Sequence, residues 1–406
     1  MDYSALIKKQ RDFFNTRVTR GFEWRRDQLK KLREVLLTND QLIYDAIYRD
    51  LRRPADQTKY MEFDRIIMEI DYALEHLKEW MEPERKQDEP YGIPLIYKDP
   101  LGCTLIISPF NFPAVLALRP LVNSISAGNT VILKPSEVAL NTANALSTIF
   151  KNFNEVSRYR DAQATISLLN NRFDHIFYTG SPSIAKSIMA QAAVHLTPTT
   201  MELGGKCPAV VLEDCDLDRA VQSIVHGKFA NIYPQFVEKL KKMVVEKYGS
   251  KPKESPAYTR IINGRHFSRL QDLINRTKGR LVYKPEDEND STDLYIGPHL
   301  FEVDSTDVLM EDELFGPILP LIIVDSLDFA INFINEREKP LNAYVFTKDE
   351  QKIERFLTST YSANAVANAM QLPFSGVGFS GNGQKYHGKF GFETFSHQKA
   401  VVKAKY

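Results

Sequence analysis

A glutamate followed by paired glycines is the strongest chemical signal in this 406-residue sequence. Glu202 stands in the run MELGGK, at the end of an expected strand, and Gly204 and Gly205 follow it closely. A carboxylate is costly to bury among apolar residues unless it is paired or functional. Paired glycines allow a ligand or another segment to approach the backbone closely. Glu202 is therefore a candidate functional residue, and the alternative is a carboxylate that simply reaches solvent.

Three more expected strand ends carry polar residues. Asn111 in LIISPFNFP could donate its amide to a carbonyl oxygen, as an oxyanion hole requires, although asparagine is also a common turn residue. Lys134 and Glu137 in VILKPSEVA could hold a nucleotide ribose, or could serve the start of the next helix. Gly180 and Ser181 open a helix in YTGSPSIAK, where backbone N–H groups could bind phosphate. That turn lacks the G-x-G-x-x-G pattern and is a weak signal by itself.

Alternating strands and helices must position these residues. Residues 4–81 repeat apolar residues at three- and four-residue spacing, which predicts helices with solvated charged faces. Residues 82–100 contain four prolines and predict an extended arm or hairpin. From residue 103 onward, short apolar runs such as CTLIISP, TVILKPS and HIFYTGS alternate with helical segments. This order predicts a parallel, doubly wound α/β sheet, which binds ligands at the carboxyl ends of its strands.

The second half of the sequence continues the same style less regularly. Helices are expected in RAVQSIVHGKF, FVEKLKKMVVEKY and FAINFINERE, and strands in ILPLIIVDS and NAYVFTK. Residues 284–293, KPEDENDSTD, are expected to form a polar surface loop. Between the first two helices, GKFAN runs into IYPQFVEKL, and a proline cannot sit in a helix interior.

Composition narrows the functional class. Lys+Arg and Asp+Glu both number 52, so the chain has no excess of positive charge that would indicate binding of nucleic acid. The three cysteines argue for a reducing compartment, and a charged N-terminal segment is not a secretory signal. No apolar run approaches the roughly 18 residues of a membrane span. A cytoplasmic protein without a metal site is expected.

Five segments of the chain resemble, in the same order, the signature segments of the aldehyde dehydrogenase superfamily: SPFNFP, LKPSE, FYTGS, MELGGK and EDELFGP. The class 3, fatty-aldehyde branch of the superfamily resembles this chain most, through FDHIFYTGS, HLTPTTMELGGK and YHGKFGFETFSHQKAV. The resemblance covers nearly the whole chain. It implies the aldehyde dehydrogenase fold. The expected parts are a Rossmann-like NAD(P)-binding domain (1–81 and 101–206), a shortened α/β catalytic domain (207–388), and oligomerisation arms (82–100 and 389–406) of a homodimer.

The resemblance also implies a chemistry, in which NAD or NADP oxidises a medium- or long-chain or aromatic aldehyde to a carboxylic acid through a cysteine thioester. Glu202 matches the family's general base, and Asn111 matches its oxyanion-stabilising amide. Ile184 matches the position beside the adenine, and Lys134 and Glu137 match those that hold the adenosine ribose. Gly180 and Ser181 match the turn near the pyrophosphate. Gly204, Glu313 and Phe315 match the positions around the nicotinamide. The resemblance leaves open whether the cofactor is NAD or NADP. A Glu137 carboxylate at the ribose would repel the 2′-phosphate of NADP and so disfavours NADP.

One element of the family pattern is missing. In the family, GKF-x-N leads into a Gly-Gln-x-Cys turn that carries the nucleophile, whereas here residues 227–240 read GKFANIYPQFVEKL. The remaining cysteines, Cys103, Cys207 and Cys215, are poor substitutes, because free cysteines are among the most buried residue types. Two interpretations follow. The chain is either a working dehydrogenase with another nucleophile, or a catalytically inactive pseudoenzyme or truncated isoform that retains nucleotide binding or dimerisation. A third possibility is an α/β interaction protein without a ligand.

Overall fold

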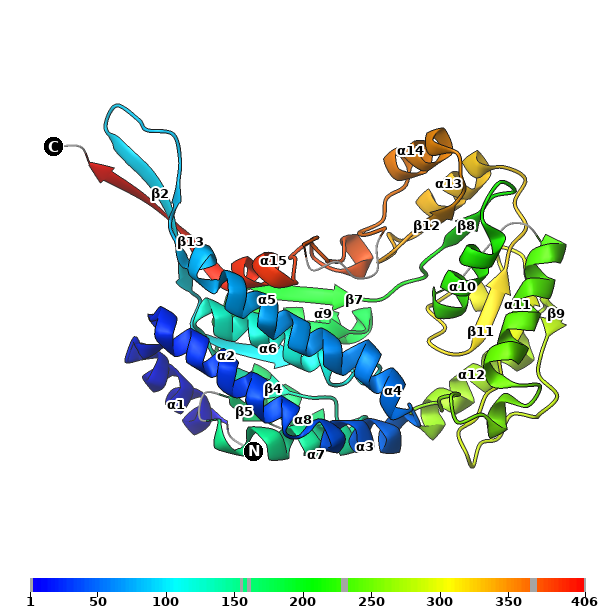
Figure 1. Cartoon of the computed structure of the whole chain (residues 1–406), viewed down its shortest axis with the longest axis horizontal. Helices are drawn as coiled ribbons and strands as arrows, with labels where there is room; N and C mark the ends of the chain where they lie inside the picture. Colours follow the sequence, from blue (N-terminus) through cyan, green and yellow to red (C-terminus); the bar gives the residue numbers. More distant parts are fainter. Residues whose placement is uncertain (1–2, 154–155, 159–161, 228–232, 366–370, 405–406) are drawn as a thin grey trace.

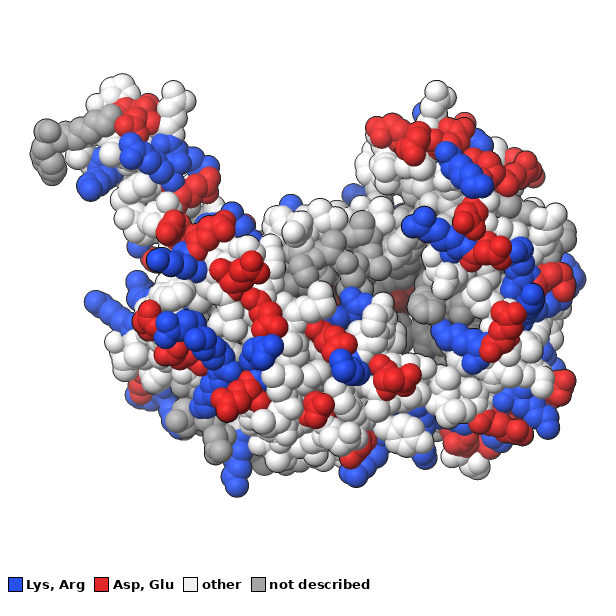
Figure 2. Space-filling view, in the orientation of Figure 1, with Lys and Arg blue, Asp and Glu red and all other residues white. Residues whose placement is uncertain are grey.

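The computed structural model describes residues 3–153, 156–158, 162–227, 233–365 and 371–404. The described chain forms two α/β units side by side, and an arm extends from the first unit (Figure 1). On the face drawn in Figure 2, basic and acidic side chains are interspersed over both units. Within the described residues, no helix is long and apolar enough to cross a membrane.

The N-terminal segment is helical, as predicted. Its elements are α1 (Ser4–Asn15), α2 (Phe22–Leu37), α3 (Asp40–Leu51), α4 (Ala55–Thr58), a π-helical turn (Lys59–Phe63) and α5 (Asp64–Met81). The expectation that all charged side chains here are solvated is wrong for Arg25, Glu62 and Glu69, which are buried. Each has a partner inside the protein: the guanidinium of Arg25, for example, donates to the carbonyl oxygens of Thr19 (3.0 Å) and Ser126 (3.1 Å).

A five-stranded parallel sheet forms the centre of the first unit and confirms the predicted doubly wound fold. Its strands are β3 (Cys103–Ile107), β4 (Thr130–Lys134), β5 (Val156–Arg158), β6 (His175–Gly180) and β7 (Thr199–Leu203), in the order β5-β4-β3-β6-β7. All four neighbouring pairs are parallel. The helices that follow the strands are α6 (Val115–Ala127), α7 (Leu140–Ile149), α8 (Ala162–Leu169) and α9 (Pro182–Val194).

Both faces of this sheet are covered. Ile106 points into a core shared with α2, α3, α5 and α6, whereas Leu105 and Ile107 point into a second core that includes α8 and α9. Because side chains alternate across a strand, two filled cores explain why these strands read as continuous apolar runs. The order reverses between β3 and β6, which is the switch point where such sheets bind ligands.

The second unit contains two small sheets. In one, β8 (Ala209–Val211) pairs with β12 (Tyr344–Phe346), and in the other β10 (His299–Glu302) lies between β9 (Arg280–Tyr283) and β11 (Ile318–Leu321). Its helices are α10 (Leu217–Gly227), α11 (Tyr233–Tyr248), α12 (Gly264–Arg276), α13 (Leu327–Asn335) and α14 (Glu350–Ser359). The expected strands, helices and polar loop at 284–293 are confirmed, except that residues 228 and 229 of the expected helix RAVQSIVHGKF lie outside the described residues.

The proline between the GKFAN and FVEKL segments lies near the start of a described helix. Helix α10 ends at Gly227 and α11 begins at Tyr233, so Pro234 falls in the first turn, where its missing N–H is tolerated. Residues 228–232, which form the junction itself, lie outside the described residues.

The arm confirms the expected hairpin at residues 82–100. Strand β2 (Gly92–Pro100) pairs with β1 (Glu84–Arg85) and, over nine residues, with the C-terminal strand β13 (Ser396–Ala404). Before β13, helix α15 (Gly388–Thr394) brings aromatic side chains back into the first unit. The ring of Phe392 lies 5.7 Å from that of Trp80, and Phe395 stacks on Phe177 at 5.6 Å.

Candidate active site

The register of the sheet brings the polar strand ends to one edge. Ile107 of β3 pairs with Tyr178 of β6, and Thr179 of β6 pairs with Glu202 of β7. Neighbouring strands lie about 4.8 Å apart, so the end of β3 is about 10 Å from Glu202 across β6. Side chains from both ends can reach a ligand bound between them.

The side chain of Glu202 is buried and forms no ion pair within the described residues. Its side chain belongs to a residue only 3% exposed, and neither carboxylate oxygen has a hydrogen-bond partner within the described residues. Burial raises the pKa of Glu202 well above its ordinary value of 4.5, and the nearby backbone amide of Gly376 opposes this rise. The solvent-exposed alternative for Glu202 is therefore wrong, and its oxygens remain available to a ligand or water.

A glycine-rich loop that the sequence analysis did not assign to the site covers the edge of β7. Asn382 accepts a hydrogen bond from the amide of Met201 (3.0 Å) and donates to the carbonyl of Thr199 (2.6 Å), as a neighbouring strand would. Gly381 bridges to Glu202 with φ 156°, and a Cβ there would lie 2.4 Å from the Met201 carbonyl. The glycines of LPFSGVGFSG were the signal for this close approach.

Asn111 lies in the turn after β3. Its backbone oxygen accepts a hydrogen bond from Arg53 (2.7 Å), while its buried side-chain Oδ1 has no partner within the described residues. The preceding ring of Phe110 meets the rings of His266 (5.2 Å) and Phe315 (5.7 Å) in the second unit. Asn111 thus has a fixed backbone beside the boundary between the units.

Lys134 and Glu137 form an ion pair after β4, with the lysine buried and the glutamate partly exposed. The alternative in which they serve a helix start is wrong, because α7 begins only at Leu140. The carboxylate of Asp50 caps that helix by accepting from the backbone and side chain of Thr142 (2.8 and 2.7 Å). Lys134 and Glu137 therefore have no capping duty in this fold.

Gly180 and Ser181 form the turn between β6 and α9. A Cβ at position 180 would lie 2.2 Å from the Tyr178 hydroxyl, so only glycine fits. Ser181 occupies the position before the helix, but its side chain caps no helix amide and instead pairs with the Ser183 hydroxyl (3.1 Å). Ile184 in the first turn is half exposed. The first amides of α9 thus open onto a small polar and apolar surface suited to a nucleotide.

Gly204, Glu313 and Phe315 meet where the two units join. Glu313 Oε2 accepts a hydrogen bond from the Gly205 amide (3.2 Å), and a Cβ on Gly204 would lie only 2.0 Å from that oxygen. Phe315 has φ 52°, in the left-handed region, and is 43% exposed. This conformation costs a non-glycine residue roughly 1–3 kcal/mol, and such residues are enriched at functional sites.

These observations fit a dinucleotide along the carboxyl edge of the sheet. The backbone N–H groups in the first turn of α9 suit a pyrophosphate. The Lys134–Glu137 pair at the end of β4 suits the hydroxyls of a ribose. Gly204, which has no side chain, lets the backbone lie close to Glu313. The sequence analysis missed Arg53, Asn382 and the covering loop, which hold these groups without standing at strand ends.

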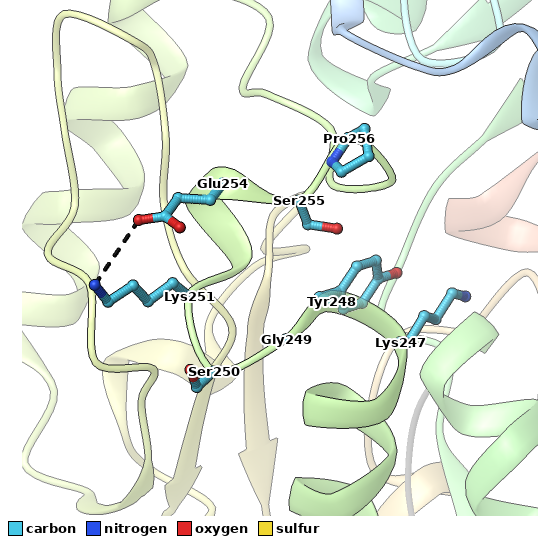
Figure 3. Close-up of a pocket in the computed structure, with 8 residues that line it drawn as sticks. All are labelled: Lys247, Tyr248, Gly249, Ser250, Lys251, Glu254, Ser255 and Pro256. Carbon is cyan, nitrogen blue, oxygen red and sulfur yellow. Dashed lines mark ion pairs between the residues drawn. The ribbon is translucent and has the colours of Figure 1, made fainter.

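A shallow hollow of about 430 Å³ lies elsewhere, at the C-terminal end of α11 (Figure 3). It is lined by residues 247–251 and 254–256, with an ion pair between Lys251 and Glu254 (3.8 Å). None of the expected site residues lines it.

Comparison with known proteins identifies the family. The model of the "Aldehyde dehydrogenase family" matches residues 1–401. The chain is 40% identical to the rat (Rattus norvegicus) "Aldehyde dehydrogenase, dimeric NADP-preferring", covering 98% of this chain and 94% of the relative. It is also 40% identical to "Aldehyde dehydrogenase family 3 member A2" of Pongo abelii, covering 98% and 87%.

Among solved structures, the "Substrate bound state of Staphylococcus Aureus AldH" superposes with a TM-score of 0.93 at 33% identity, over 98% of this chain and 93% of that one. The chain therefore belongs to the aldehyde dehydrogenase family, in its class 3 branch, whose members oxidise aldehydes to carboxylic acids with NAD or NADP.

Proposed function

We propose that this family member binds NAD(P) and an aldehyde at the carboxyl edge of the sheet but forms no covalent thioester. The observation that carries this proposal is the position of the chain's only three cysteines, all of which are described and free. A thioester mechanism needs an accessible thiolate beside the carbonyl carbon, and none of the three meets that need.

Burial disfavours a thiolate at two of the three cysteines, and the third uses its thiol in a local hydrogen bond. Cys103 begins β3, at the opposite edge of the sheet from Glu202, and burial raises the pKa of its thiol to about 12. The thiol of Cys215, in the turn before α10, has its pKa raised by burial and by the flanking carboxylates of Asp214 and Asp216. Cys207 Sγ lies 3.7 Å from the Gly205 carbonyl, at the entry to β8.

A lost segment explains the missing nucleophile. The alignment with the rat relative runs over 434 residues, which exceeds this chain's 406 residues, so at least 28 aligned positions have no residue here. The Gly-Gln-x-Cys turn of the family pattern belongs between α10 and α11. Only five residues, 228–232, separate those helices.

The remaining residues would hold the cofactor and the aldehyde. Lys134 and Glu137 hold the adenosine ribose, while Gly180, Ser181 and Ile184 lie against the pyrophosphate and adenine. Gly204, Glu313 and Phe315 position the nicotinamide, the ring that would supply the hydride acceptor of the family's reaction. Asn111 donates to the carbonyl oxygen, and Glu202 holds or accepts a proton beside it. Medium- or long-chain or aromatic aldehydes are the substrate class.

The same proposal covers organisation and location. The NAD(P)-binding domain comprises residues 1–81 and 101–206, the catalytic domain 207–388, and the arms 82–100 and 389–406. The arms pair two copies into a homodimer, because β13 presents an outer strand edge and the rat relative is named as dimeric. Three free cysteines favour a reducing compartment such as the cytoplasm.

Calorimetry and mass spectrometry test the proposal. The protein should bind NAD or NADP, and Lys134→Met should weaken that binding. Incubation with NAD(P) and benzaldehyde or a long-chain aldehyde should yield neither NADH or NADPH nor an acylated peptide. A matched Lys352→Met variant in the second unit should bind like the parent. An acylated cysteine would establish a working dehydrogenase instead, and no heat with either nucleotide would leave only a fold without a ligand.

A further inference from the structure

The π-helical turn between α4 and α5 places a carboxylate deep inside the first unit. Residues Lys59–Phe63 form this turn, and Glu62 within it is fully buried. Such a turn adds a residue to a helix and re-aims the side chains around it, and these turns occur frequently at functional sites. The buried charge needs a local explanation, because an unpaired carboxylate is costly there.

Glu62 binds the start of helix α6. Its Oε2 accepts hydrogen bonds from the backbone amides of Ala114 (2.8 Å) and Val115 (3.0 Å), and its Oε1 pairs with Arg53. Burial raises the pKa of Glu62, whereas Arg53 and the two amides lower it. The carboxylate therefore fixes the chain directly after the turn that contains Asn111.

Arg53 fixes the other side of the same turn. While Nη1 pairs with Glu62, Nη2 donates to the backbone oxygen of Asn111 (2.7 Å), and the guanidinium lies over the ring of Phe112 (4.7 Å). A guanidinium can make these contacts together because its donors form a rigid planar fork. One side chain thus contacts two consecutive residues of the turn.

We propose that Arg53 and Glu62 are positioning residues that hold Asn111 with its side-chain amide directed to the ligand. This inference rests on the proposed role of Asn111 in binding the carbonyl oxygen. Three backbone hydrogen bonds and the contact of Arg53 with the Phe112 ring hold residues 111–115, whereas Oδ1 of the Asn111 side chain has no hydrogen-bond partner within the described part of the chain. A fixed backbone that carries an amide group whose oxygen has no partner inside the protein is the kind of arrangement that electrostatic preorganisation requires.

Arg53→Lys separates positioning from folding. Lysine keeps the positive charge beside Glu62 but lacks the fork needed to reach the Asn111 carbonyl at the same time. The matched control is Arg119→Lys, because Arg119 in α6 pairs with buried Glu69 (2.9 Å), which accepts from the Gly388 amide (2.7 Å) at the start of α15 and not from the turn that contains Asn111. Both substitutions remove the guanidinium fork from a buried pair with a glutamate.

The first readout is the ¹⁵N–¹H resonance of the Asn111 side-chain amide in asparagine-labelled protein, assigned by its loss in Asn111→Ala. Arg53→Lys should shift or broaden this resonance, and Arg119→Lys should leave it in place. An unchanged resonance in Arg53→Lys, or an equal change in both variants, would overturn the positioning role.

The second readout is the affinity for benzaldehyde in the presence of NADH. Arg53→Lys should weaken it about tenfold, the scale of one charge-assisted hydrogen bond, and should have no further effect in the Asn111→Ala background. Additive losses would mean that Arg53 acts by another route. If Asn111→Ala itself leaves the affinity unchanged, the proposed function of Asn111 fails, while the resonance test still decides whether Arg53 positions it.

Discussion

Replacing Glu202 by glutamine should change how the stability of the first unit depends on pH. Burial raises the pKa of Glu202 above its ordinary value of 4.5, so the folded protein holds a proton that the unfolded chain has already released. Stability contributed by this proton is fully present below the unfolded pKa and is lost as the pH rises toward the folded pKa. Glutamine has a similar shape and no charge, so this loss disappears in the variant.

The slope of the effect follows from linkage. One proton released on unfolding costs the parent about 1.4 kcal/mol of unfolding free energy per pH unit, over the interval between the two pKa values. The free-energy difference between Glu202→Gln and the parent should therefore grow at up to that slope and then level off. Because neither Glu202 oxygen has a hydrogen-bond partner in the described structure, glutamine sacrifices no internal bond that the carboxylate made.

Tryptophan fluorescence offers a selective assay, because the chain's two tryptophans, Trp24 and Trp80, both lie in the first unit. Urea unfolding would be measured at several values between about pH 5 and pH 8. Glu213→Gln, which removes an exposed carboxylate, serves as the control. Parallel stability curves for Glu202→Gln and the parent would refute the argument that Glu202 is buried without a partner.

Three further substitutions test other contacts. Gly204→Ala puts a Cβ 2.0 Å from Glu313 Oε2, so NADH affinity by fluorescence titration should fall about tenfold, and an unchanged affinity would remove Gly204 from the cofactor site. Arg119→Met leaves the Glu69 carboxylate buried without its cation and should cost about 3–5 kcal/mol in urea unfolding, whereas a near-neutral result would show that the carboxylate finds water. Gly128→Ala forces a side chain into φ 89° and against a buried guanidinium of α2, so it should cost about 1–3 kcal/mol, and a higher melting temperature would contradict that strain.

The central sheet was predictable because its strands are buried on both faces. Continuous apolar runs at 103–107, 130–134 and 175–180 left little choice of element, and parallel strands must put their carboxyl ends at one edge. The common location of Asn111 and Glu202 at that edge followed from the same rule. Strand β9, by contrast, was not predicted, because Arg280–Tyr283 forms an outer strand with two exposed residues and no strong apolar pattern.

The supporting groups were beyond reach from sequence. Glu62 stands in a charged helical segment, YMEFDR, where every local rule favours a solvated side chain. Its burial depends on the π-helical turn and on contacts with the start of α6, some fifty residues away in the chain. Likewise, the loop over Glu202 is fixed by Asn382 across a separation of about 180 residues. Long-range pairing of this kind leaves no period in the sequence.

The return of the C-terminus to the first unit governs when this protein can finish folding during synthesis. Phe395 stacks on Phe177, accepts a hydrogen bond from Asn129 (2.9 Å) through its carbonyl, and leads into the nine-residue ladder with β2. When a ribosome has released only residues 1–206, the core of the first unit therefore still lacks the contacts that Phe392 and Phe395 make with it. Until Phe392 and Phe395 emerge, the aromatic surface that they cover in the folded unit stays exposed to chaperones and proteases.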